Sequence, residues 1–472
     1  MDRLNAELVV VGAGPGGYAA AFYAADLGKK VVLVERDSRL GGVCLTQGCI
    51  PSKALIHATR LISEAEESAT RGIVFERPTV DVGKLRSWKD SIIDKLSHGI
   101  KSLAESRGVQ VVEGRGHFES SRALRVETEE GQRFIDFEDA ILAVGSRPSI
   151  PKAWDLGNPR VMTSTEALEV DSIPERLLVI GGGYIGMELG TVYAALGSKV
   201  VVVEALPAIL AGADPDLVRP VLRRARERFD ELRLETKVKK LATKGKQIEV
   251  TSEHESEERS DLFDCVLIAV GRRPNSDDIG LENTDVELDD DGFIKVDEKQ
   301  RTSDPNIYAI GDIAGGVLLA HKASKEARVA VESLLGETSV FEAVIPAVVF
   351  TDPEVAWCGL TEEDAKQQGI KVEVARFPWA ASGRAVAVDH PDGLTKLVVE
   401  PETERILGMG IVGSGAGELI GEGVVLIEMG ATARDLAESV HPHPTLSETL
   451  MECAEMFYGH ATHAAARKRA KK

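Results

Sequence analysis

Two cysteines near the N-terminus are the first residues in this 472-residue chain able to carry redox chemistry. Cys44 and Cys49 occur in Gly41-Gly-Val-Cys44-Leu-Thr-Gln-Gly-Cys49-Ile-Pro-Ser-Lys53. Taken alone, such a pair fits buried core thiols, half of a metal site or a redox-active disulfide. A zinc site needs further ligands at paired spacing, and the remaining cysteines do not supply them, so we predict no metal site. These cysteines are isolated from one another: Cys265, Cys358 and Cys453.

A histidine near the C-terminus is a candidate for acid–base chemistry. His443 begins the segment His443-Pro-Thr-Leu-Ser-Glu448. Thiolates rather than thiols attack disulfides, and a base with a pKa of about 6.5 raises the thiolate fraction of a group whose free pKa is about 8.5. A neighbouring carboxylate such as Glu448 stabilises the imidazolium that forms. His441, two residues earlier, competes for this role.

Two glycine-rich turns indicate where nucleotides bind. In the first copy, an apolar strand over 8–11 leads into Gly12-Ala-Gly14-Pro-Gly16-Gly17, an Ala-rich helix follows, and a second strand over 31–34 ends on Glu35. Strand, glycine turn, helix and acidic residue are the context that the dinucleotide-binding fingerprint requires. We therefore predict a βαβ unit here.

The same unit recurs in the second third of the chain. A strand over 177–180 leads into Gly181-Gly-Gly183-Tyr-Ile-Gly186, and a strand over 200–203 ends on Glu204. The first glycine and the acidic residue are 23 positions apart in both copies, from 12 to 35 and from 181 to 204. Two dinucleotide-binding units are therefore expected, and the alternative is a pair of Rossmann-like turns without ligands.

The chemistry of these motifs is specific. Glycines allow a tight turn and a close approach of the backbone, so that a pyrophosphate sits at the positive N-terminus of the helix. Glu35 and Glu204 then accept hydrogen bonds from ribose hydroxyls. Glu204 disfavours a 2′-phosphate, and residues 205–208 contain no cation, which indicates NAD rather than NADP. Beside two such units, the cysteine pair becomes a candidate redox disulfide.

Later segments extend this organisation. Strands over 140–144 and 266–270 each end in Gly and Pro, and a strand over 306–310 runs into Gly311-Asp312. The carboxylate thus lies at a strand's carboxyl end, where open α/β sheets bind ligands. From residue 343 onward, Val-rich strands and helical stretches between 417 and 438 indicate a separate α+β domain.

Taken together, these motifs resemble the flavin disulfide reductase family over nearly the whole chain. The cysteine block and the histidine block are the most specific parts of the resemblance. It implies an α/β fold with two Rossmann-like dinucleotide-binding domains, for FAD and NAD, and a C-terminal α+β dimerisation domain. The expected boundaries are 1–150 and 275–343 for the two parts of the FAD-binding domain, 151–274 for the NAD-binding domain and 344–472 for the interface domain.

The resemblance also implies roles for individual side chains. Cys44 would form a mixed disulfide with substrate and Cys49 would face the flavin. Lys53 would lie beside the flavin ring and pair with Glu188. The other subunit would contribute His443, oriented by Glu448, as the acid/base, which leaves His441 as a structural residue. The predicted cofactor-binding residues are Gly12, Gly14, Gly17, Glu35, Lys53, Gly116, Gly145, Asp312 on the ribityl chain, Ala320, Gly181, Gly183, Tyr184, Ile185, Gly186, Glu188, Glu204, Val238 and Gly271.

The implied activity is oxidation of dihydrolipoyl groups on a carrier domain or protein, with reduction of NAD+. The enzyme would be a homodimer with shared active sites in a 2-oxo acid dehydrogenase or glycine cleavage complex. A glutathione-reductase-like enzyme is expected to have NADPH-binding arginines near Glu204. A mercuric-reductase-like enzyme is expected to have an extra cysteine pair near the C-terminus. A non-catalytic nucleotide-binding subunit is the rival of another class. Tyr184 is bulkier than the aliphatic residue frequent here, and it either gates the nicotinamide pocket or packs under the turn.

Composition narrows the choice of partners and compartment. A net charge of −20 has the wrong sign for binding nucleic acid. The uncharged stretch 8–25 has the length of a membrane span, but its glycines and proline break it. A signal peptide is not expected either, because Asp2 and Glu7 flank a single Arg3 ahead of the first motif. We therefore expect no nucleic-acid or membrane partner and a cytoplasmic location. The basic residues at the chain's end are expected to form a solvated tail: Arg467, Lys468, Arg469, Lys471 and Lys472.

Overall fold

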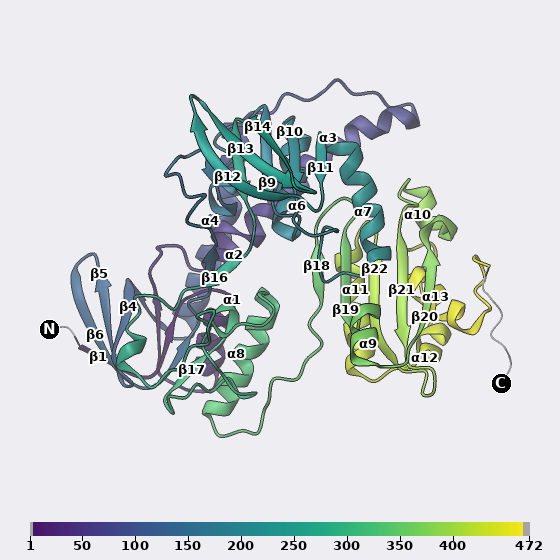
Figure 1. Ribbon diagram of the computed structural model, residues 1–472. Coiled ribbons are helices and arrows are strands. Elements are labelled where there is room, and N and C mark those ends of the chain that lie inside the picture. The colour runs from purple at the N-terminus through teal and green to yellow at the C-terminus, as the bar shows by residue number, and fades with distance from the viewer. Residues whose placement is uncertain (1–2, 466–472) are drawn as a thin grey trace.

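The computed structural model describes residues 3–465, which form three groups of sheets and helices (Figure 1). The first unit lies at the lower left of Figure 1, the second at the top and the C-terminal unit at the right. The basic residues 467–472 lie outside the described part of the chain. Between residues 3 and 465, no helix combines the length and the apolar character needed to cross a membrane.

The first unit is built on a seven-stranded sheet in the order β3-β2-β1-β6-β5-β4, with β17 also pairing with β6. Residues 8–11 at its centre are all buried, as expected for a parallel strand covered on both faces. Helices α1, α4 and α8 cover one face. The strands are β1 (Arg3–Val11), β2 (Val31–Glu35), β3 (Gln110–Glu113), β4 (Arg115–Ser120), β5 (Ala123–Thr128), β6 (Gly131–Leu142) and β17 (Ile307–Ala309). The helices are α1 (Pro15–Asp26), α2 (Gly42–Gln47), α3 (Cys49–Glu67), η1 (Ser68–Arg71), α4 (Val82–Ser106), η2 (Leu281–Asn283), η3 (Gly311–Ala314) and α8 (Ala320–Leu334).

The second unit repeats this plan with a five-stranded parallel sheet in the order β11-β10-β9-β15-β8. A separate antiparallel meander, β12-β13-β14, packs its few apolar residues against one face of this sheet. A two-stranded ribbon of β7 and β16 links the first and second units. The strands are β7 (Ser146–Pro148), β8 (Val161–Met162), β9 (Arg176–Ile180), β10 (Lys199–Val203), β11 (Glu231–Arg233), β12 (Lys237–Lys244), β13 (Gln247–His254), β14 (Glu257–Phe263), β15 (Cys265–Ile268) and β16 (Arg272–Pro274). The helices are α5 (Ser164–Glu169), α6 (Tyr184–Leu196) and α7 (Pro215–Arg228).

The C-terminal unit is an antiparallel sheet in the order β18-β19-β22-β21-β20, with α11, α12 and α13 packed into the same core. Its strands are β18 (Ala347–Val349), β19 (Val355–Gly359), β20 (Glu373–Pro378), β21 (Leu394–Val399) and β22 (Ile406–Val412). Its helices are α9 (Glu362–Gln368), η4 (Trp379–Ala381), α10 (Gly383–Ala387), α11 (Ala416–Glu428), α12 (Ala433–Glu438) and α13 (Glu448–Tyr458).

The predicted fold class is confirmed, because two α/β units with parallel strands at their centres precede an α+β unit. One predicted strand begins earlier than expected: residues 140–142 of the predicted run over 140–144 are the end of β6, which begins at Gly131 and ends at Leu142. The meander β12–β14 was not anticipated. Its strands are dominated by charged and polar residues, and only Leu241, Ile248, Val250 and Phe263 are both apolar and buried, so an apolar pattern gives little signal.

The three units share a hydrophobic core. Leu55 on α3 of the first unit and Val355 on β19 of the C-terminal unit join the core of the second unit. Residues far apart in sequence are therefore held in fixed positions around the junction of the units.

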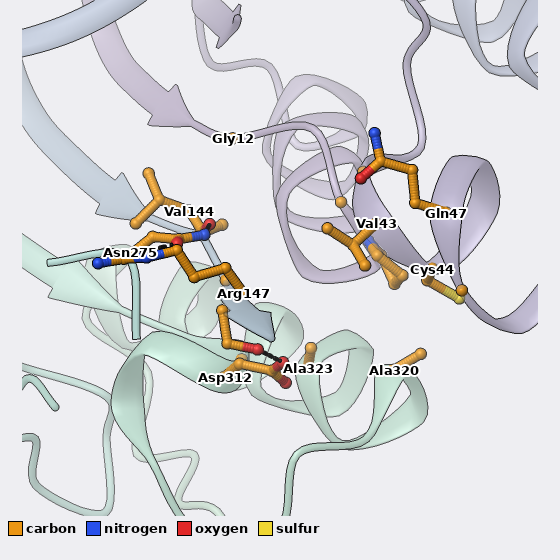
Figure 2. A pocket seen from close by; sticks show the side chains of 18 of the residues that line it. Gly12, Val43, Cys44, Gln47, Val144, Arg147, Asn275, Asp312, Ala320 and Ala323 are labelled. Carbon is orange, nitrogen blue, oxygen red and sulfur yellow. Dashed lines mark hydrogen bonds between the residues drawn. The ribbon is translucent and has the colours of Figure 1, made fainter. Parts of the chain in front are cut away.

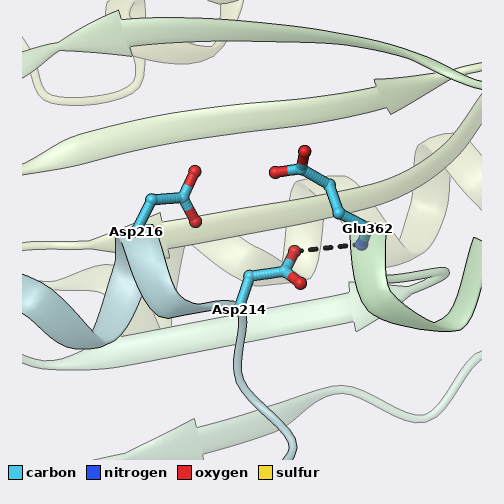
Figure 3. Close-up of side chains that lie close together, drawn as sticks. All are labelled: Asp214, Asp216 and Glu362. Carbon is cyan, nitrogen blue, oxygen red and sulfur yellow. Dashed lines mark hydrogen bonds between the residues drawn. The ribbon is translucent and has the colours of Figure 1, made fainter. Parts of the chain in front are cut away.

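A cluster of buried charges also joins the second and C-terminal units. Figure 3 shows Asp214 and Asp216, at the start of α7, facing Glu362 at the start of α9. Three carboxylates so close require a cation. The ammonium of Lys396, on β21, lies 2.6, 2.7 and 2.5 Å from Asp214, Asp216 and Glu362. Burial disfavours the charged form, but the three carboxylates together raise the pKa of Lys396.

Replacing Lys396 by Met leaves three carboxylates facing one another without their ammonium, and the Lys396 side chain is only 2% exposed. We expect Lys396→Met to lower the free energy of unfolding by about 3–5 kcal/mol, the usual cost of removing one partner from a buried ion pair. Urea unfolding followed by circular dichroism measures this. The control is Lys244→Met, which breaks an exposed pair with Glu249 and should cost less than about 1 kcal/mol. Equal effects of the two changes would contradict the assignment.

Candidate active site

A pocket of about 550 Å³ lies between the first and second units. Its walls come from the carboxyl ends of β1 and β2, from α2 and α3, from the start of α6, and from the region around η3 and α8. Figure 2 shows Gly12 on the turn after β1, with Val43, Cys44 and Gln47 from α2 on one side and Asp312 on another. The volume lies within the range of small-molecule sites.

The first glycine of each motif adopts a conformation that other residues rarely take. Gly12 has φ +100° and Gly181 has φ +110°. A Cβ at these positions would lie 2.4 Å from the Ala143 oxygen and 2.3 Å from the Ala269 oxygen, which is far too close. The two turns are therefore built in the same way, each against the residue directly after the neighbouring strand, β6 or β15, of its own unit.

The last glycine of each motif lets the helix approach the turn. A Cβ on Gly17 would lie 1.8 Å from the Gly12 oxygen, and one on Gly186 would lie 2.0 Å from the Gly181 oxygen. Neither position tolerates a side chain. Gly17 accordingly lies behind the turn and is not among the pocket-lining residues.

The middle glycine of each motif faces open space. The nearest atom to a Cβ on Gly14 is the Gly42 Cα at 3.9 Å, and nothing lies within 4 Å of one on Gly183. No side chain caps the helix that follows, and neither α1 nor α6 has an acidic residue in its first turn. Uncapped, uncharged helix N-termini beside open backbone suit a pyrophosphate. The residues present therefore fit dinucleotides.

The acidic residue of each unit holds its glycine turn in place through hydrogen bonds to the main chain. The Glu35 and Glu204 carboxylates each accept an N–H bond from the residue after the first glycine, at 2.7 and 2.6 Å. Each also accepts one from the residue two positions after itself, at 3.1 and 2.8 Å. Burial raises the pKa of Glu35. This main-chain role was not anticipated, and it gives a physical reason for the identical spacing of the two copies.

The cysteines lie at the junction of two consecutive helices. Gly48 separates α2 from α3, so Cys44 on α2 comes next to Cys49 at the start of α3. Both are free thiols in this structure. A hydrogen bond from the Cys44 thiol and the nearby Lys53 ammonium outweigh burial and lower the pKa of Cys49 to about 7. That hydrogen bond and burial raise the pKa of Cys44.

Lys53 lies one turn after Cys49 on the same face of α3. Its Nζ donates a hydrogen bond to the Glu188 Oε2 at 2.8 Å. Glu188 is buried on α6 of the second unit, so this contact joins the two nucleotide units beside the thiols.

Asp312, in η3 shortly after β17, contacts a pair of residues that were not predicted for the site. It accepts a hydrogen bond from the Ser146 hydroxyl, drawn as a dashed line in Figure 2. Arg272 Nε in turn donates to the Ser146 Oγ at 2.7 Å. Both residues lie in the β7–β16 ribbon, and the matching Gly-Ser-Arg-Pro and Gly-Arg-Arg-Pro ends were the available signal.

The structure brings most of the predicted residues of the first unit to this pocket and leaves others elsewhere. The pocket-lining set is Gly12, Gly14, Glu35, Cys44, Cys49, Lys53, Gly116, Gly145, Tyr184, Ile185, Glu188, Asp312 and Ala320. The set not lining it is Gly17, Gly181, Gly183, Gly186, Glu204, Val238, Gly271, His443 and Glu448. Among the predicted residues of the second unit, the glycines and Glu204 belong to the second turn and to the carboxyl edge of the second sheet. Val238 instead packs against the core that this sheet shares with the meander.

His443 and Glu448 form a pair on the C-terminal unit. His443 Nδ1 lies 2.8 Å from the Glu448 Oε1, and the ring is 72% exposed. Burial acts against ionisation of Glu448, but the Thr445 N–H and His443 together lower its pKa. His441 has different surroundings: its ring is buried against Glu422 at 2.9 Å.

Two family models cover most of the chain. Residues 6–327 match the pyridine nucleotide-disulphide oxidoreductase model, and residues 345–454 match the dimerisation domain of the same family. The chain therefore belongs to the pyridine nucleotide-disulphide oxidoreductase family.

Within that family, similar curated relatives are dihydrolipoyl dehydrogenases. The one from Vibrio parahaemolyticus is 47% identical over 100% of this chain and 99% of its own length. The one from Haemophilus influenzae is 46% identical over 98% of this chain and 96% of its own. Among solved structures, LpdA from Mycobacterium tuberculosis has a TM-score of 0.88 at 27% identity and covers 96% of this chain and 99% of its own. The HOCl-induced flavoprotein disulfide reductase RclA from Escherichia coli has a TM-score of 0.85 at 27% identity and covers 95% and 99%.

These matches confirm the predicted family, enzyme class and cofactors, FAD and NAD. The predicted domain boundaries and the roles of individual site residues stay predictions.

The acidity of Cys49 is directly measurable. With a pKa of about 7, half of the reduced protein carries the Cys49 thiolate near pH 7, and its alkylation rate falls about tenfold per pH unit well below that. Iodoacetamide labelling of the dithiothreitol-reduced, desalted protein, read by mass spectrometry of each cysteine peptide, gives this profile. Cys358 and Cys453 serve as internal controls, because burial raises the pKa of each to about 12. A Cys49 midpoint near that of an ordinary thiol would contradict the arrangement.

Proposed function

We propose that this protein is a dihydrolipoyl dehydrogenase in which the side chains described above carry the reaction. It oxidises a dihydrolipoyl group to the lipoyl disulfide and reduces NAD+. The observation that carries the proposal is an acidified thiol, Cys49, adjacent to a second thiol and to Lys53 in a pocket between two nucleotide-type units. The relatives that are dihydrolipoyl dehydrogenases over their full length support it.

The protein's own thiols perform the first half of the reaction. A substrate thiolate attacks the Cys44 sulfur of the Cys44–Cys49 disulfide, so that a mixed disulfide forms and Cys49 leaves as a thiolate. The second substrate thiol then displaces Cys44, and the substrate departs as a cyclic disulfide. Two electrons now reside on the cysteine pair. The low pKa of Cys49 makes it the better leaving group and holds the negative charge beside Lys53.

FAD, when bound, supplies two-electron transfer between the reduced cysteine pair and NAD+. The residues proposed to hold it are those of the first turn, Glu35, Lys53 and Asp312, with Gly116 and Ala320 contributing backbone. The second turn and Glu204 are proposed to hold NAD+. The Glu204 carboxylate opposes a 2′-phosphate, in keeping with the choice of NAD.

His443 is proposed as the base that deprotonates the substrate thiol, with Glu448 stabilising the imidazolium. An exposed ring that does not line the pocket of its own chain suits action in a partner's site. A homodimer with shared sites follows, and the match of residues 345–454 to a dimerisation domain supports it.

The proposal extends to the cellular setting. The substrate is a dihydrolipoyl group carried by another domain or protein, which implies a 2-oxo acid dehydrogenase or glycine cleavage complex. A cytoplasmic location is proposed as well: the three cysteines outside the redox pair, Cys265, Cys358 and Cys453, are free, and reducing compartments preserve thiols.

Cys44→Ser tests the proposed chemistry. We expect bound flavin to remain near wild-type content, because Cys44 holds no predicted cofactor contact, while dihydrolipoamide:NAD+ turnover falls at least about 10³-fold, since no disulfide can form. Absorbance spectra and NADH production measure the two quantities. Cys265→Ser, a change away from the pocket, should leave both unaffected. Full turnover by Cys44→Ser would favour the non-catalytic binding subunit instead.

Tyr184→Ile tests whether this ring gates nucleotide access. Tyr184 begins α6, lines the pocket and is 42% exposed, so an aliphatic residue would open the space that its ring covers. We expect the KM for NAD+ to change by about twofold or more, or the NADH oxidase side activity to rise similarly. Steady-state kinetics under air and under argon separate the two effects. Unchanged kinetics with unchanged stability would assign the ring to packing alone.

A further inference from the structure

Phe350 brings the C-terminal unit into contact with Lys53 and Glu188, two residues that line the pocket. Phe350 follows β18 directly and stands half-buried at the junction of the three units. Its backbone N–H donates a hydrogen bond to the Glu188 Oε1 at 3.0 Å. The Lys53 Nζ lies over its ring, 4.4 Å from the centroid.

Glu188 therefore connects Phe350 and Lys53. One of its oxygens accepts from Lys53 at 2.8 Å and the other from Phe350. The carboxylate is buried, while the Lys53 side chain remains 33% exposed. An ammonium with partial access to water has room to leave a single carboxylate, so a second attraction is needed to hold it in one place.

We propose that Phe350 is a positioning residue for the redox site: its ring, together with Glu188, holds the Lys53 ammonium beside Cys49. The inference rests on the proposed role of Cys49 as the redox thiol, and it adds a contribution from the C-terminal unit of the same chain.

The ring is suited to this task by its charge distribution and by its support. The face of an aromatic ring is negative and attracts an ammonium within about 6 Å of the centroid. The first turn of α11 lies beside the ring, because a Cβ added at Gly417 would lie 3.5 Å from the Phe350 Cε1. This neighbouring segment limits the space in which the ring can move.

The expected consequence concerns the charge on Cys49. Lys53 lowers the pKa of Cys49, whereas Glu188 raises it. Without the ring, the ammonium is free to shift toward Glu188 and water, so its effect on the thiol weakens. The other titratable groups around these residues are Cys44 on α2, Tyr184 on α6 and Asp312 in η3.

The test compares Phe350→Leu, which removes the ring, with Phe350→Tyr, which keeps it. In reduced holoenzyme, the alkylation rate of Cys49 at each pH reports the fraction of Cys49 that is a thiolate. The long-wavelength absorbance band between the thiolate and the flavin provides a second readout of that fraction. A cation–π contact at a partly exposed site corresponds to a shift of about half a pKa unit, so Phe350→Leu should lower the Cys49 alkylation rate at pH 7 about two- to threefold. Phe350→Tyr should behave as wild type.

Two results would overturn the proposal. One is a pH dependence of Cys49 alkylation that is unchanged in Phe350→Leu. The other is an equal shift of that pH dependence in Phe350→Leu and Phe350→Tyr, which would assign the effect to a change in packing rather than to loss of the ring. Phe350→Met carries the same expectation as Phe350→Leu and replaces it if the leucine variant does not fold. Thermal midpoint and flavin content establish that each variant is intact. Alkylation is measured without turnover, so failure of this inference is separable from failure of the proposed lipoamide activity.

Discussion

A single ammonium group, on Lys53, stands where the three units of this protein meet. It emerges from α3 of the first unit, donates a hydrogen bond to Glu188 of the second unit and lies over the Phe350 ring of the C-terminal unit. A charge in this position favours the Cys49 thiolate one helical turn away. The units therefore have to be assembled correctly before the thiol acquires its acidity, and the chemistry of two neighbouring cysteines becomes a property of the whole chain. The shared hydrophobic core and the buried Lys396 cluster support the same assembly from other sides.

The two nucleotide units hold their glycine turns in shape by the same set of contacts. In each, a side chain at the first glycine is excluded by the oxygen of the residue directly after a neighbouring strand, and one at the last glycine by the oxygen of the first, whereas the middle glycine faces open space. In each, a glutamate 23 residues after the first glycine accepts a hydrogen bond from the turn itself. The glutamate thus keeps the turn in shape whether or not a ribose is present, which links the geometry of the turn to the residue that would recognise the sugar. The units differ in their surroundings: the first turn opens into the pocket with the cysteines, and the second lies outside it.

Much of the site was predictable because its signals are local. The strand, turn and helix around Gly12 follow from nearby residues, and Cys44, Cys49 and Lys53 lie within ten positions of one another. Ser146 and Arg272 could not be assigned to the site in the same way, since their hydrogen bond joins positions 126 residues apart. Phe350 is further removed still, because it belongs to the antiparallel unit and reaches Lys53 only when that unit packs against the other two. Its sequence context, a short Val-rich strand, gives no indication of a contact with a redox centre.

The sequence by itself determined the local chemistry of this protein: two dinucleotide-type turns, a cysteine pair five residues apart, and a histidine with a carboxylate five residues away. Each of these depends on backbone conformation and side-chain type over a few residues. Tertiary structure alone decided which of them share a pocket, which thiol carries the negative charge and which distant residues hold the cation that stabilises it. Electrostatic interactions act over a few ångströms through space, so they depend on distances that only the packed units define.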